Sequence, residues 1–295
     1  MKKIGIIGAG TMGSGIAHCF AQYKFEICLF DVCEKNLDNA NVSIKTNLER
    51  MIKRDKISEN QKNEILERIS YHNKLEGNIE DCDLVVEAAT ESKKIKLEIF
   101  KDIDKLCKKD TILASNTSSI SIGEIGAQTQ REDKVIGMHF MNPVPIMKLV
   151  EVIKSKKTSQ KTIDIIMSLS KELNKIPVLV NDAPGFVANR ILLPMINESI
   201  HTLTDGVSGV QEIDTVMILG MSHPMGPLQL ADFIGLDVCL SILEVLHNGF
   251  QDEKYKPNEL LKKMVKDGEL GVKTKKGFYD YKLGIKEKTI NNRFL

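Results

Sequence analysis

The residue pattern at the start of the sequence constrains the fold more than any other part of the chain. A short apolar run, Ile4–Ile7, predicts a buried strand, and the motif Gly8-Ala-Gly-Thr-Met-Gly13 follows it directly. An apolar pattern at helical spacing comes next, and a second predicted strand, Glu26–Phe30, leads into Asp31. Strand, glycine motif, helix, strand and acid in this order are the fingerprint of a βαβ unit that binds a dinucleotide. We therefore predict dinucleotide binding rather than a merely glycine-rich turn.

Each part of this fingerprint has a physical task. The glycines allow a tight turn, close approach of the backbone to a pyrophosphate and close packing of helix on sheet. The helix N-terminus directs free N–H groups and its positive dipole end at the phosphates. Asp31 would accept hydrogen bonds from the adenosine ribose, and no Arg or Lys follows it directly to hold a 2′-phosphate. This favours NAD over NADP, although Lys35 is close in sequence. The residues expected to contact the cofactor here are Gly8, Ala9, Gly10, Thr11, Met12, Gly13 and Asp31.

Composition excludes several other classes of protein. The 295 residues suffice for two domains, and 41 basic residues against 40 acidic ones give no net field that would favour nucleic acid or a membrane surface. Six cysteines without a CxxC pair argue against a disulfide framework and against a zinc site. Only a short apolar run follows Lys2 and Lys3, and no window reaches membrane-spanning length. We expect a cytoplasmic protein with no metal, no nucleic acid partner and no membrane partner.

The order of predicted elements divides the chain. Strands and helices alternate up to the turn cluster Asn181-Asp-Ala-Pro-Gly185, with two extra helices inserted between Glu34 and Ile69. Ser58-Glu-Asn-Gln61 predicts a capping box at the start of the second inserted helix, which would carry Ile65, Leu66 and Ile69. From Phe186 onward the pattern predicts helices only, over Phe186–Leu203, Val210–Leu219, Leu228–His247 and Asn258–Lys266. We therefore expect an α/β Rossmann-type dinucleotide-binding domain with a helical insert at 1–182 and an all-α domain for substrate and dimerisation at 183–281. Residues 282–295 are polar and basic, and we expect a C-terminal tail.

Basic residues crowd the end of the first inserted helix and the turn after it. They are Lys45, Arg50, Lys53, Arg54 and Lys56. One interpretation is a solvated helix face with cations near the helix C-terminus, where the helix dipole favours them. The other is a docking site for the phosphates of a ligand. The residues alone favour neither interpretation.

The stretch Gly137–Glu151 places a histidine and a carboxylate on two apolar runs joined by a turn. His139 ends the first run, Pro143 and Pro145 stiffen the turn, and Glu151 lies on the returning run. A carboxylate that orients a histidine is the usual arrangement for moving a proton near neutral pH. Taken alone, the stretch favours a core histidine beside an ordinary surface glutamate. The dinucleotide fingerprint in the same chain shifts the balance towards an acid/base pair.

Two further polar groups have competing interpretations. Hydroxyls cluster in Ser115-Asn-Thr-Ser-Ser119, just past a predicted strand, where open α/β sheets bind ligands. They could equally cap the helix that follows, although Ser118 is a candidate for more than capping. Asn189 begins the first helix after the turn cluster, among apolar residues, and such an asparagine is more often packed than catalytic.

Seven blocks of this sequence, taken together and in order, resemble the L-3-hydroxyacyl-CoA dehydrogenase family, in particular its short bacterial members that act on 3-hydroxybutyryl-CoA. The resemblance covers residues 1–281. The blocks are GIIGAGTMGSGIA (5–17), DLVVEAATE (83–91), ASNTSSI (114–120), GMHFMNPVPIMKLVEV (137–152), DAPGFVANR (182–190), HPMGPLQLAD (223–232) and KKGFYDY (275–281).

The resemblance implies a role for each matching residue. It implies that His139 is the catalytic acid/base, that Glu151 orients it, and that Ser118 and Asn189 bind the oxygen at the reacting carbon. It further implies an acyl-CoA substrate, NAD as cofactor, a homodimer and a place in fatty acid or butyrate metabolism. The nicotinamide half of the cofactor would be lined by Glu91, Lys96, Ser118 and Asn142, with Lys273 as a further contact. The coenzyme A phosphates would lie near Arg50, Lys53 and Arg54.

The expected reaction is therefore the NAD(H)-dependent interconversion of a (S)-3-hydroxyacyl-CoA, such as 3-hydroxybutyryl-CoA, and the 3-oxoacyl-CoA, such as acetoacetyl-CoA. A related dehydrogenase of a free hydroxy or sugar acid is the alternative enzyme, but such an enzyme has no use for a phosphate dock. A non-catalytic NAD-binding protein is disfavoured by the intact set of Ser118, His139, Glu151 and Asn189.

Overall fold

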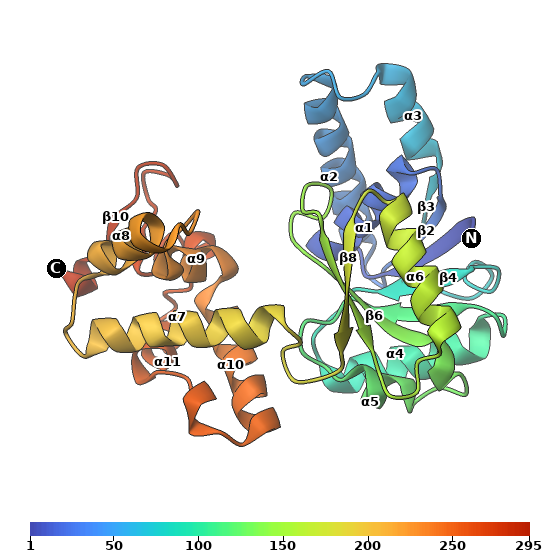
Figure 1. The fold of residues 1–295 in the computed structure, drawn as a ribbon. Coiled ribbons are helices and arrows are strands. Elements are labelled where there is room, and N and C mark those ends of the chain that lie inside the picture. Colours follow the sequence, from blue (N-terminus) through green and yellow to red (C-terminus); the bar gives the residue numbers. More distant parts are fainter. The chain divides into compact units, whose positions relative to one another are not determined.

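The computed structural model describes residues 1–295, and the chain divides into two compact units, Met1–Ala183 (unit 1) and Pro184–Leu295 (unit 2). Unit 1 is built on one eight-stranded sheet in the order β3-β2-β1-β4-β5-β6-β7-β8 (Figure 1). All neighbouring strands are parallel except β6 and β7, which are antiparallel. The strands are β1 (Lys3–Ile7), β2 (Glu26–Phe30), β3 (Ile69–His72), β4 (Leu84–Glu87), β5 (Ile112–Ser115), β6 (Val135–Phe140), β7 (Leu149–Lys154) and β8 (Ile176–Asn181).

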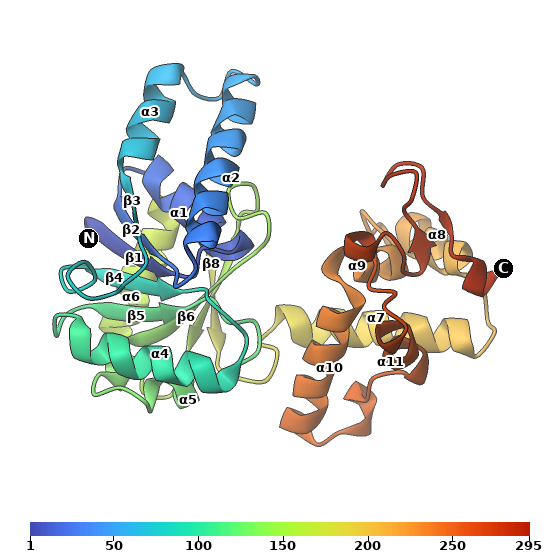
Figure 2. The ribbon, with the colours of Figure 1, turned by 180° about the vertical axis from the view of Figure 1, so that it is seen from behind.

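Helices cover both faces of this sheet, which explains why most of its strands are continuous apolar runs. Helices α4 and α5 lie together on one face, while α1 and α6 pack on the other (Figures 1 and 2). Strand residues such as Ile4, Ile27 and Leu29 form one core with Ile16 of α1 and Ile166 of α6. The helices are α1 (Thr11–Gln22), α2 (Glu34–Ile52), α3 (Glu59–Glu67), α4 (Lys93–Leu106), α5 (Ile122–Gly126) and α6 (Gln160–Glu172), with a short 3-10 helix η1 (Glu132–Lys134). The predicted Rossmann-type fold of the first domain is confirmed.

The helical insert is a hairpin of α2 and α3. Ser58 accepts a hydrogen bond from the Gln61 N–H at 3.2 Å, and the Gln61 side chain accepts one from the Ser58 N–H at 2.8 Å, so the capping box predicted from the sequence is present. The sequence prediction placed Ile69 on the second helix, and this is wrong. Helix α3 ends at Glu67, and Ile69 begins the edge strand β3. The alternating apolar and polar residues of Ile69-Ser-Tyr-His72 suit an edge strand.

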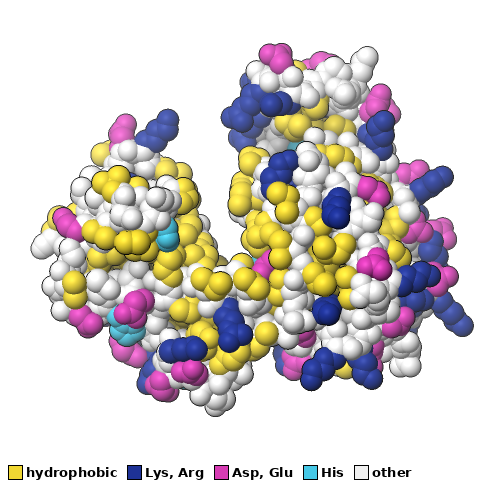
Figure 3. All heavy atoms as spheres, in the orientation of Figure 1, with side chains coloured by type: hydrophobic (Ala, Val, Ile, Leu, Met, Phe, Trp, Pro, Cys, Tyr) yellow, Lys and Arg dark blue, Asp and Glu magenta, His cyan; other side chains and the backbone are white.

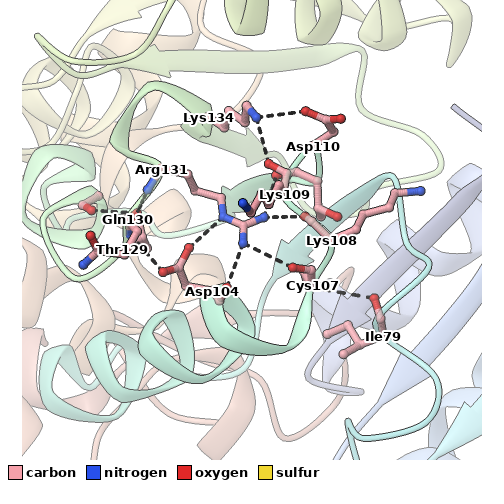
Figure 4. A network of polar contacts seen from close by, with 12 residues as sticks. Ile79, Asp104, Cys107, Lys108, Lys109, Asp110, Thr129, Gln130, Arg131 and Lys134 are labelled. Carbon is pink, nitrogen blue, oxygen red and sulfur yellow. Dashed lines mark hydrogen bonds and ion pairs between the residues drawn. The ribbon is translucent and has the colours of Figure 1, made fainter.

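Arg131 fixes the C-terminal end of α4, the helix that carries Lys96. Its guanidinium contacts Asp104 Oδ1 at 2.7 Å and donates to the carbonyl oxygens of Asp104 at 2.7 Å and of Lys108 at 2.6 Å (Figure 4). The last carbonyls of a helix have no partner within the helix, and a guanidinium with several donors satisfies them. The end of α4 is therefore held in place without a glycine cap.

Unit 2 is helical with its own apolar core, as predicted. Leu193, Leu228, Leu243 and Phe278 are each 0% exposed and belong to this core. The helices are α7 (Ala188–Thr204), α8 (Val210–Met221), α9 (Pro227–Ile234), α10 (Leu236–Phe250) and α11 (Glu259–Lys266), with 3-10 helices η2 (Glu253–Tyr255), η3 (Val272–Thr274) and η4 (Asn292–Phe294). No helix of the chain is both long and apolar enough to cross a membrane.

Two details of unit 2 differ from the sequence prediction. The helix predicted over Leu228–His247 is broken at Gly235, whose φ of 102° is a conformation that side chains rarely adopt, so α9 ends there and α10 begins. The expected tail is not separate, because Thr289–Ile290 (β10) pairs antiparallel with Tyr279–Asp280 (β9). Asn291 is 1% exposed and donates to the Gly277 carbonyl at 2.6 Å. Buried polar contacts of this kind tie residues 289–295 to unit 2.

Candidate active site

The glycine loop has the geometry that close approach to a pyrophosphate requires. Gly8 has φ of 99°, and a Cβ on it would lie 2.5 Å from the Ala89 Cα. A Cβ on Gly13 would lie 1.7 Å from the Gly8 carbonyl oxygen, whereas a Cβ on Gly10 would meet nothing within 4 Å. Gly8 and Gly13 thus permit close packing within the protein, and Gly10 faces open space. The first turn of α1 has neither a side-chain cap nor an acidic residue, so no carboxylate of its own competes for the N–H groups.

Asp31 lies directly after β2 and is joined to this loop. Its Oδ2 accepts the Ala9 N–H at 2.8 Å, and its Oδ1 accepts the Cys33 N–H at 2.9 Å. These bonds hold the carboxylate at the carboxyl end of the sheet beside the glycine loop. An ionised carboxylate has about four acceptor positions, so it keeps capacity for ribose hydroxyls. Loop, helix N-terminus and carboxylate together fit a dinucleotide with an unsubstituted ribose.

His139 and Glu151 face each other across the antiparallel pair β6–β7. The two residues are in register, and His139 Nδ1 lies 2.8 Å from Glu151 Oε2. Their exposed fractions are only 7% and 2%. The other ring nitrogen, Nε2, lies 3.2 Å from Ser118 Oγ. The structure therefore brings Ser118, His139 and Glu151 into one row, and a buried carboxylate at Nδ1 favours the tautomer that leaves Nε2 as the base.

Glu91 positions the loop that carries Ser118. Its Oε1 accepts the Ser118 N–H at 2.5 Å, and its Oε2 accepts the Thr117 hydroxyl at 2.8 Å. Lys96 Nζ lies 3.8 Å from the same carboxylate. A pocket of about 300 Å³ is lined by residues of the glycine loop and of this cluster, namely Gly10, Thr11, Met12, Ala88, Ala89, Thr90, Glu91, Lys96, Asn116 and Ser118. The predicted nicotinamide-side residues Glu91, Lys96 and Ser118 thus line one cavity with the glycine loop.

Lys96, which lines this pocket, forms a buried ion pair with Glu87, a residue that no sequence pattern had marked as functional. Glu87 is 0% exposed, and its Oε2 lies 2.5 Å from the Nζ of Lys96, which is 1% exposed. The same oxygen accepts the Ser115 hydroxyl at 2.8 Å, and Oε1 accepts the Ala89 N–H at 2.9 Å. The one available signal was an acid ending the apolar strand Leu84–Glu87, which is an unusual place for a charge without a partner.

The asparagines of the site differ in their surroundings. Asn116 Oδ1 accepts the Phe140 N–H at 2.9 Å and so fixes the end of the strand that carries His139. Asn142, the predicted cofactor contact, is exposed in the turn between β6 and β7. The predicted helix-capping role of the hydroxyl cluster falls to Ser121, which accepts the Glu124 N–H at 3.3 Å. Ser118 is therefore not the cap of α5.

Two predicted site residues belong to unit 2. Asn189 lies in the first turn of α7 and is 9% exposed. Lys273 lies in η3 and forms an ion pair with Asp237 of α10, so unit 2 itself supplies a counter-charge for it. The roles of both residues stay predictions.

The three predicted coenzyme A residues lie at the tip of the α2–α3 hairpin. Arg50 is in the last turn of α2, with Lys53 and Arg54 in the turn that follows, and all three are exposed. Arg50 Nη1 donates to Asn47 Oδ1 at 3.4 Å, and the ion pairs at this tip join other residues, Lys62 with Glu49 and with Glu59. Lys and Arg side chains gather near this tip in Figure 3.

Fold and site together define a class. The chain has a glycine loop at the carboxyl end of a parallel sheet, an acid after the second strand, and a buried histidine–carboxylate pair. These features together are typical of an NAD-dependent dehydrogenase. The family comparison agrees. Residues 3–183 match the NAD binding domain of 3-hydroxyacyl-CoA dehydrogenase, and residues 185–281 match the C-terminal domain of the same family. The chain belongs to the 3-hydroxyacyl-CoA dehydrogenase family and is an NAD-dependent oxidoreductase.

Individual relatives resemble the chain over nearly its whole length. It is 51% identical to 3-hydroxybutyryl-CoA dehydrogenase of Clostridioides difficile, over 95% of this chain and 99% of the relative. It is 40% identical to the mitochondrial hydroxyacyl-coenzyme A dehydrogenase of Homo sapiens, over 96% of this chain and 92% of the relative. Among solved structures, (S)-3-hydroxybutyryl-CoA dehydrogenase of Ralstonia eutropha matches with a TM-score of 0.92 at 45% identity, covering 95% of this chain and 99% of that one.

Proposed function

We propose that this protein interconverts (S)-3-hydroxyacyl-CoA and 3-oxoacyl-CoA with NAD(H), and that its substrates are 3-hydroxybutyryl-CoA and acetoacetyl-CoA. The observation that carries the proposal is the buried pair of His139 and Glu151, with Ser118 at the free ring nitrogen. The short-chain substrate is supported by relatives that are about half identical to the chain and are known as 3-hydroxybutyryl-CoA dehydrogenases or probable ones. Cytoplasmic location and a role in butyrate or fatty acid metabolism stay predictions.

His139 moves the proton in the proposed reaction. When bound, NAD exchanges a hydride with carbon 3 of the substrate. In oxidation, His139 Nε2 takes the proton of the 3-hydroxyl, and in reduction the imidazolium returns it to the oxygen. Glu151 accepts a hydrogen bond from Nδ1–H throughout, so it fixes the tautomer and stabilises the positive ring.

Ser118 and Asn189 are the proposed donors to the substrate oxygen. Donors aimed at an oxygen that gains charge contribute about 3–4 kcal/mol each in comparable sites. The Glu91 carboxylate accepts hydrogen bonds from the Ser118 N–H and the Thr117 hydroxyl. These bonds fix the backbone from which the Ser118 hydroxyl projects. Lys96, Glu91 and Asn142 are the proposed contacts of the nicotinamide half, with Lys273 as a further one.

The coenzyme A moiety is proposed to dock on the tip of the α2–α3 hairpin. Arg50, Lys53 and Arg54 are exposed there and present guanidinium and ammonium donors suited to phosphates. A dehydrogenase of free acids has no need of this cluster, which is why the thioester is favoured over the free acid.

A homodimer through unit 2 is also proposed. Helix α8 exposes Val216, Leu219 and Met221 by 60%, 79% and 60%, and hydrophobic side chains are visible on the surface of this unit in Figure 3. Contiguous exposed apolar side chains are typical of association surfaces. Light scattering coupled to size-exclusion chromatography measures the mass, and a monomeric mass would contradict the proposal.

The decisive experiment follows NADH consumption by its ultraviolet absorbance, with acetoacetyl-CoA and, in parallel, free acetoacetate. We expect rapid loss of NADH with the thioester only. The variant His139→Gln should bind NADH with unchanged affinity and lose most turnover, because the glutamine cannot carry the proton. NADH binding without turnover on either substrate would overturn the proposed substrate, and turnover of the free acid alone would favour a free hydroxy acid dehydrogenase. Wild-type turnover in His139→Gln would remove this residue from the mechanism.

A further inference from the structure

A second pocket of unit 1 lies apart from the candidate active site. Its volume is about 440 Å³, and it is lined by side chains of β1, β2, β3 and α3 and by Asn78. Lys3 and Glu26 begin their strands and Arg68 directly precedes β3, so the pocket lies mainly towards the amino ends of these strands. The glycine loop, Asp31 and His139 lie at or beyond the carboxyl ends of theirs. No step of the proposed reaction uses this pocket.

Two cysteine side chains meet beside this pocket because β1 carries a glycine between them. Gly5 of β1 is in register with Cys28 of β2 on one side and with Val85 of β4 on the other. Cys82, just before β4, has its Sγ 3.2 Å from the position that a Cβ on Gly5 would occupy. The missing side chain leaves room above β1, and the Cys82 thiol occupies it beside Cys28 while donating a hydrogen bond to the Asn78 carbonyl at 3.9 Å. Cys28 is 5% exposed and lines the pocket, whereas Cys82 is 0% exposed.

Polar groups on the other side favour the thiolate of Cys28. Ser70 Oγ of β3 lies 3.5 Å from Cys28 Sγ and 2.8 Å from His72 Nε2, with the Ile27 carbonyl as a second acceptor at 3.0 Å. Contact with the Cys82 thiol lowers the pKa of Cys28 most, burial opposes it, and Ser70, Lys3 and His72 lower it further, to about 5. Contact with the Cys28 sulfur and burial raise the pKa of Cys82. Cys28 is therefore the more acidic thiol of the pair.

The other buried thiols of the chain lack this arrangement. Cys107 Sγ lies 3.8 Å from the Ile79 carbonyl (Figure 4), and burial raises its pKa to about 11. Burial also raises the pKa of Cys239 to about 12. Cys33 is an exposed free cysteine, and the hydrogen bond of its backbone N–H goes to Asp31 and not to another cysteine. A reactive thiol needs thiolate character together with a route for the reagent, and Cys28 combines a lowered pKa with a place in the lining of the pocket.

We propose that Cys28 and Cys82 form a peroxide-sensitive site, in which Cys28 is the attacking thiol and Cys82 the resolving one. The Cys28 thiolate attacks one oxygen of a hydroperoxide, the O–O bond breaks, and the departing oxygen takes a proton to leave as water or an alcohol. Cys28 is then a sulfenic acid. Cys82 sulfur attacks the Cys28 sulfur, and the thiol proton and the sulfenic hydroxyl leave as a second water. Two thiols are oxidised to one disulfide while the peroxide is reduced.

The second step is helped by the first. Contact with the Cys28 sulfur and the negative charge of its thiolate both raise the pKa of Cys82. Oxidation removes that negative charge, so Cys82 loses its proton more easily once Cys28 is a sulfenic acid. The disulfide then joins β2 to the segment before β4, across β1. The charged and titratable groups on the pocket side of the pair are Lys3, Glu26, Glu64, Glu67, Arg68 and His72, and Cys107 lies near Cys82.

The test uses the full-length reduced protein and its own cysteines as controls. After brief exposure to hydrogen peroxide and alkylation of remaining thiols, peptide mass spectrometry should find the Cys28–Cys82 disulfide as the main product. The variant Cys82→Ser, checked for wild-type NADH binding, should instead give a dimedone adduct on Cys28. Oxidation of Cys33 at the same rate as Cys28, or no disulfide between Cys28 and Cys82, would overturn the proposal.

A second measurement separates activation from mere exposure. The rate of alkylation by iodoacetamide is measured against pH, and each cysteine is read out by mass spectrometry. For Cys28 the rate should reach its plateau at a lower pH than for Cys33, and Ser70→Ala should move the Cys28 midpoint upward without moving that of Cys33. Equal midpoints for Cys28 and Cys33, or no effect of Ser70→Ala, would contradict the role given to Ser70 in lowering the pKa of Cys28.

Discussion

The buried ion pair of Glu87 and Lys96 predicts a large effect of one small substitution. In Glu87→Gln the amide oxygen still accepts from the Ala89 N–H or from Ser115, so the shape and some hydrogen bonds remain. The negative charge beside Lys96 is lost, and the nearest remaining carboxylate, Glu91, is 3.8 Å away. Lys96 is 1% exposed, so water cannot replace the missing partner.

The magnitude follows from burial. Removing one member of a buried ion pair costs roughly 3–5 kcal/mol, because a charge is left in a medium that solvates it poorly. Lys93–Glu124 is a matched control on the same helix α4, since its N–O distance is 2.7 Å but its side chains are 54% and 51% exposed. Glu124→Gln should cost about 0–1 kcal/mol, as exposed pairs do.

The assay is urea unfolding of both variants and the wild type, followed by far-UV circular dichroism because the chain contains no tryptophan. We expect Glu87→Gln to lose about 3 kcal/mol or more of unfolding free energy. The double variant Glu87→Gln/Lys96→Met should regain most of it, because no buried charge is left. A loss in Glu87→Gln equal to that in Glu124→Gln, or no recovery in the double variant, would refute the argument from desolvation.

Three further predictions concern the glycine loop, unit 2 and the proposed acid/base pair. Gly13→Ala should destabilise the fold because its Cβ would lie 1.7 Å from a carbonyl oxygen, whereas Gly10→Ala should unfold like the wild type and bind NADH more weakly in a fluorescence titration. Burial raises the pKa of Asp232 to about 7, above the ordinary value of about 4. The native state therefore holds this proton more tightly, so the free energy of unfolding should fall as pH rises between these values, by up to about 1.4 kcal/mol per pH unit, and Asp232→Asn should abolish that slope in urea titrations. Glu151→Gln should leave NADH affinity unchanged and lower kcat by roughly a hundredfold or more, because the glutamine cannot stabilise positive His139. Unchanged kcat would contradict its orienting role.

The sequence predicted the fold class well where one segment carries its own signal. The glycine motif and Asp31 lie within one βαβ unit, and each part of that unit can be recognised from its neighbours in the chain. His139 and Glu151 are joined by a short turn, so antiparallel pairing of two apolar runs was enough to bring them close. The capping box at Ser58 is likewise local. The catalytic, cofactor and coenzyme A roles given to particular side chains stay predictions.

Where the sequence prediction differed from the structure, the local sequence was compatible with two conformations. Ile69 fits the apolar face of a helix as well as a strand, and pairing with Ile27 of β2 decided for the strand. Gly235 could have been a weak helical residue, but its φ of 102° ends α9. Residues 282–295 have the composition of a tail, yet Asn291 and the β9–β10 pair attach part of this segment to unit 2.

The sequence by itself determined the order of elements, the dinucleotide loop and the close approach of His139 to Glu151, because these depend on periodicity, turn residues and short loops. Only the tertiary structure decided the groups that gather from separate elements. Glu87, Lys96 and Ser115 come from β4, α4 and β5, and Cys28 meets Cys82 across β1. Such contacts depend on which strands are neighbours and on what is shielded from water. Strand order and burial are properties of the packed chain, and the residue pattern of one segment does not predict them.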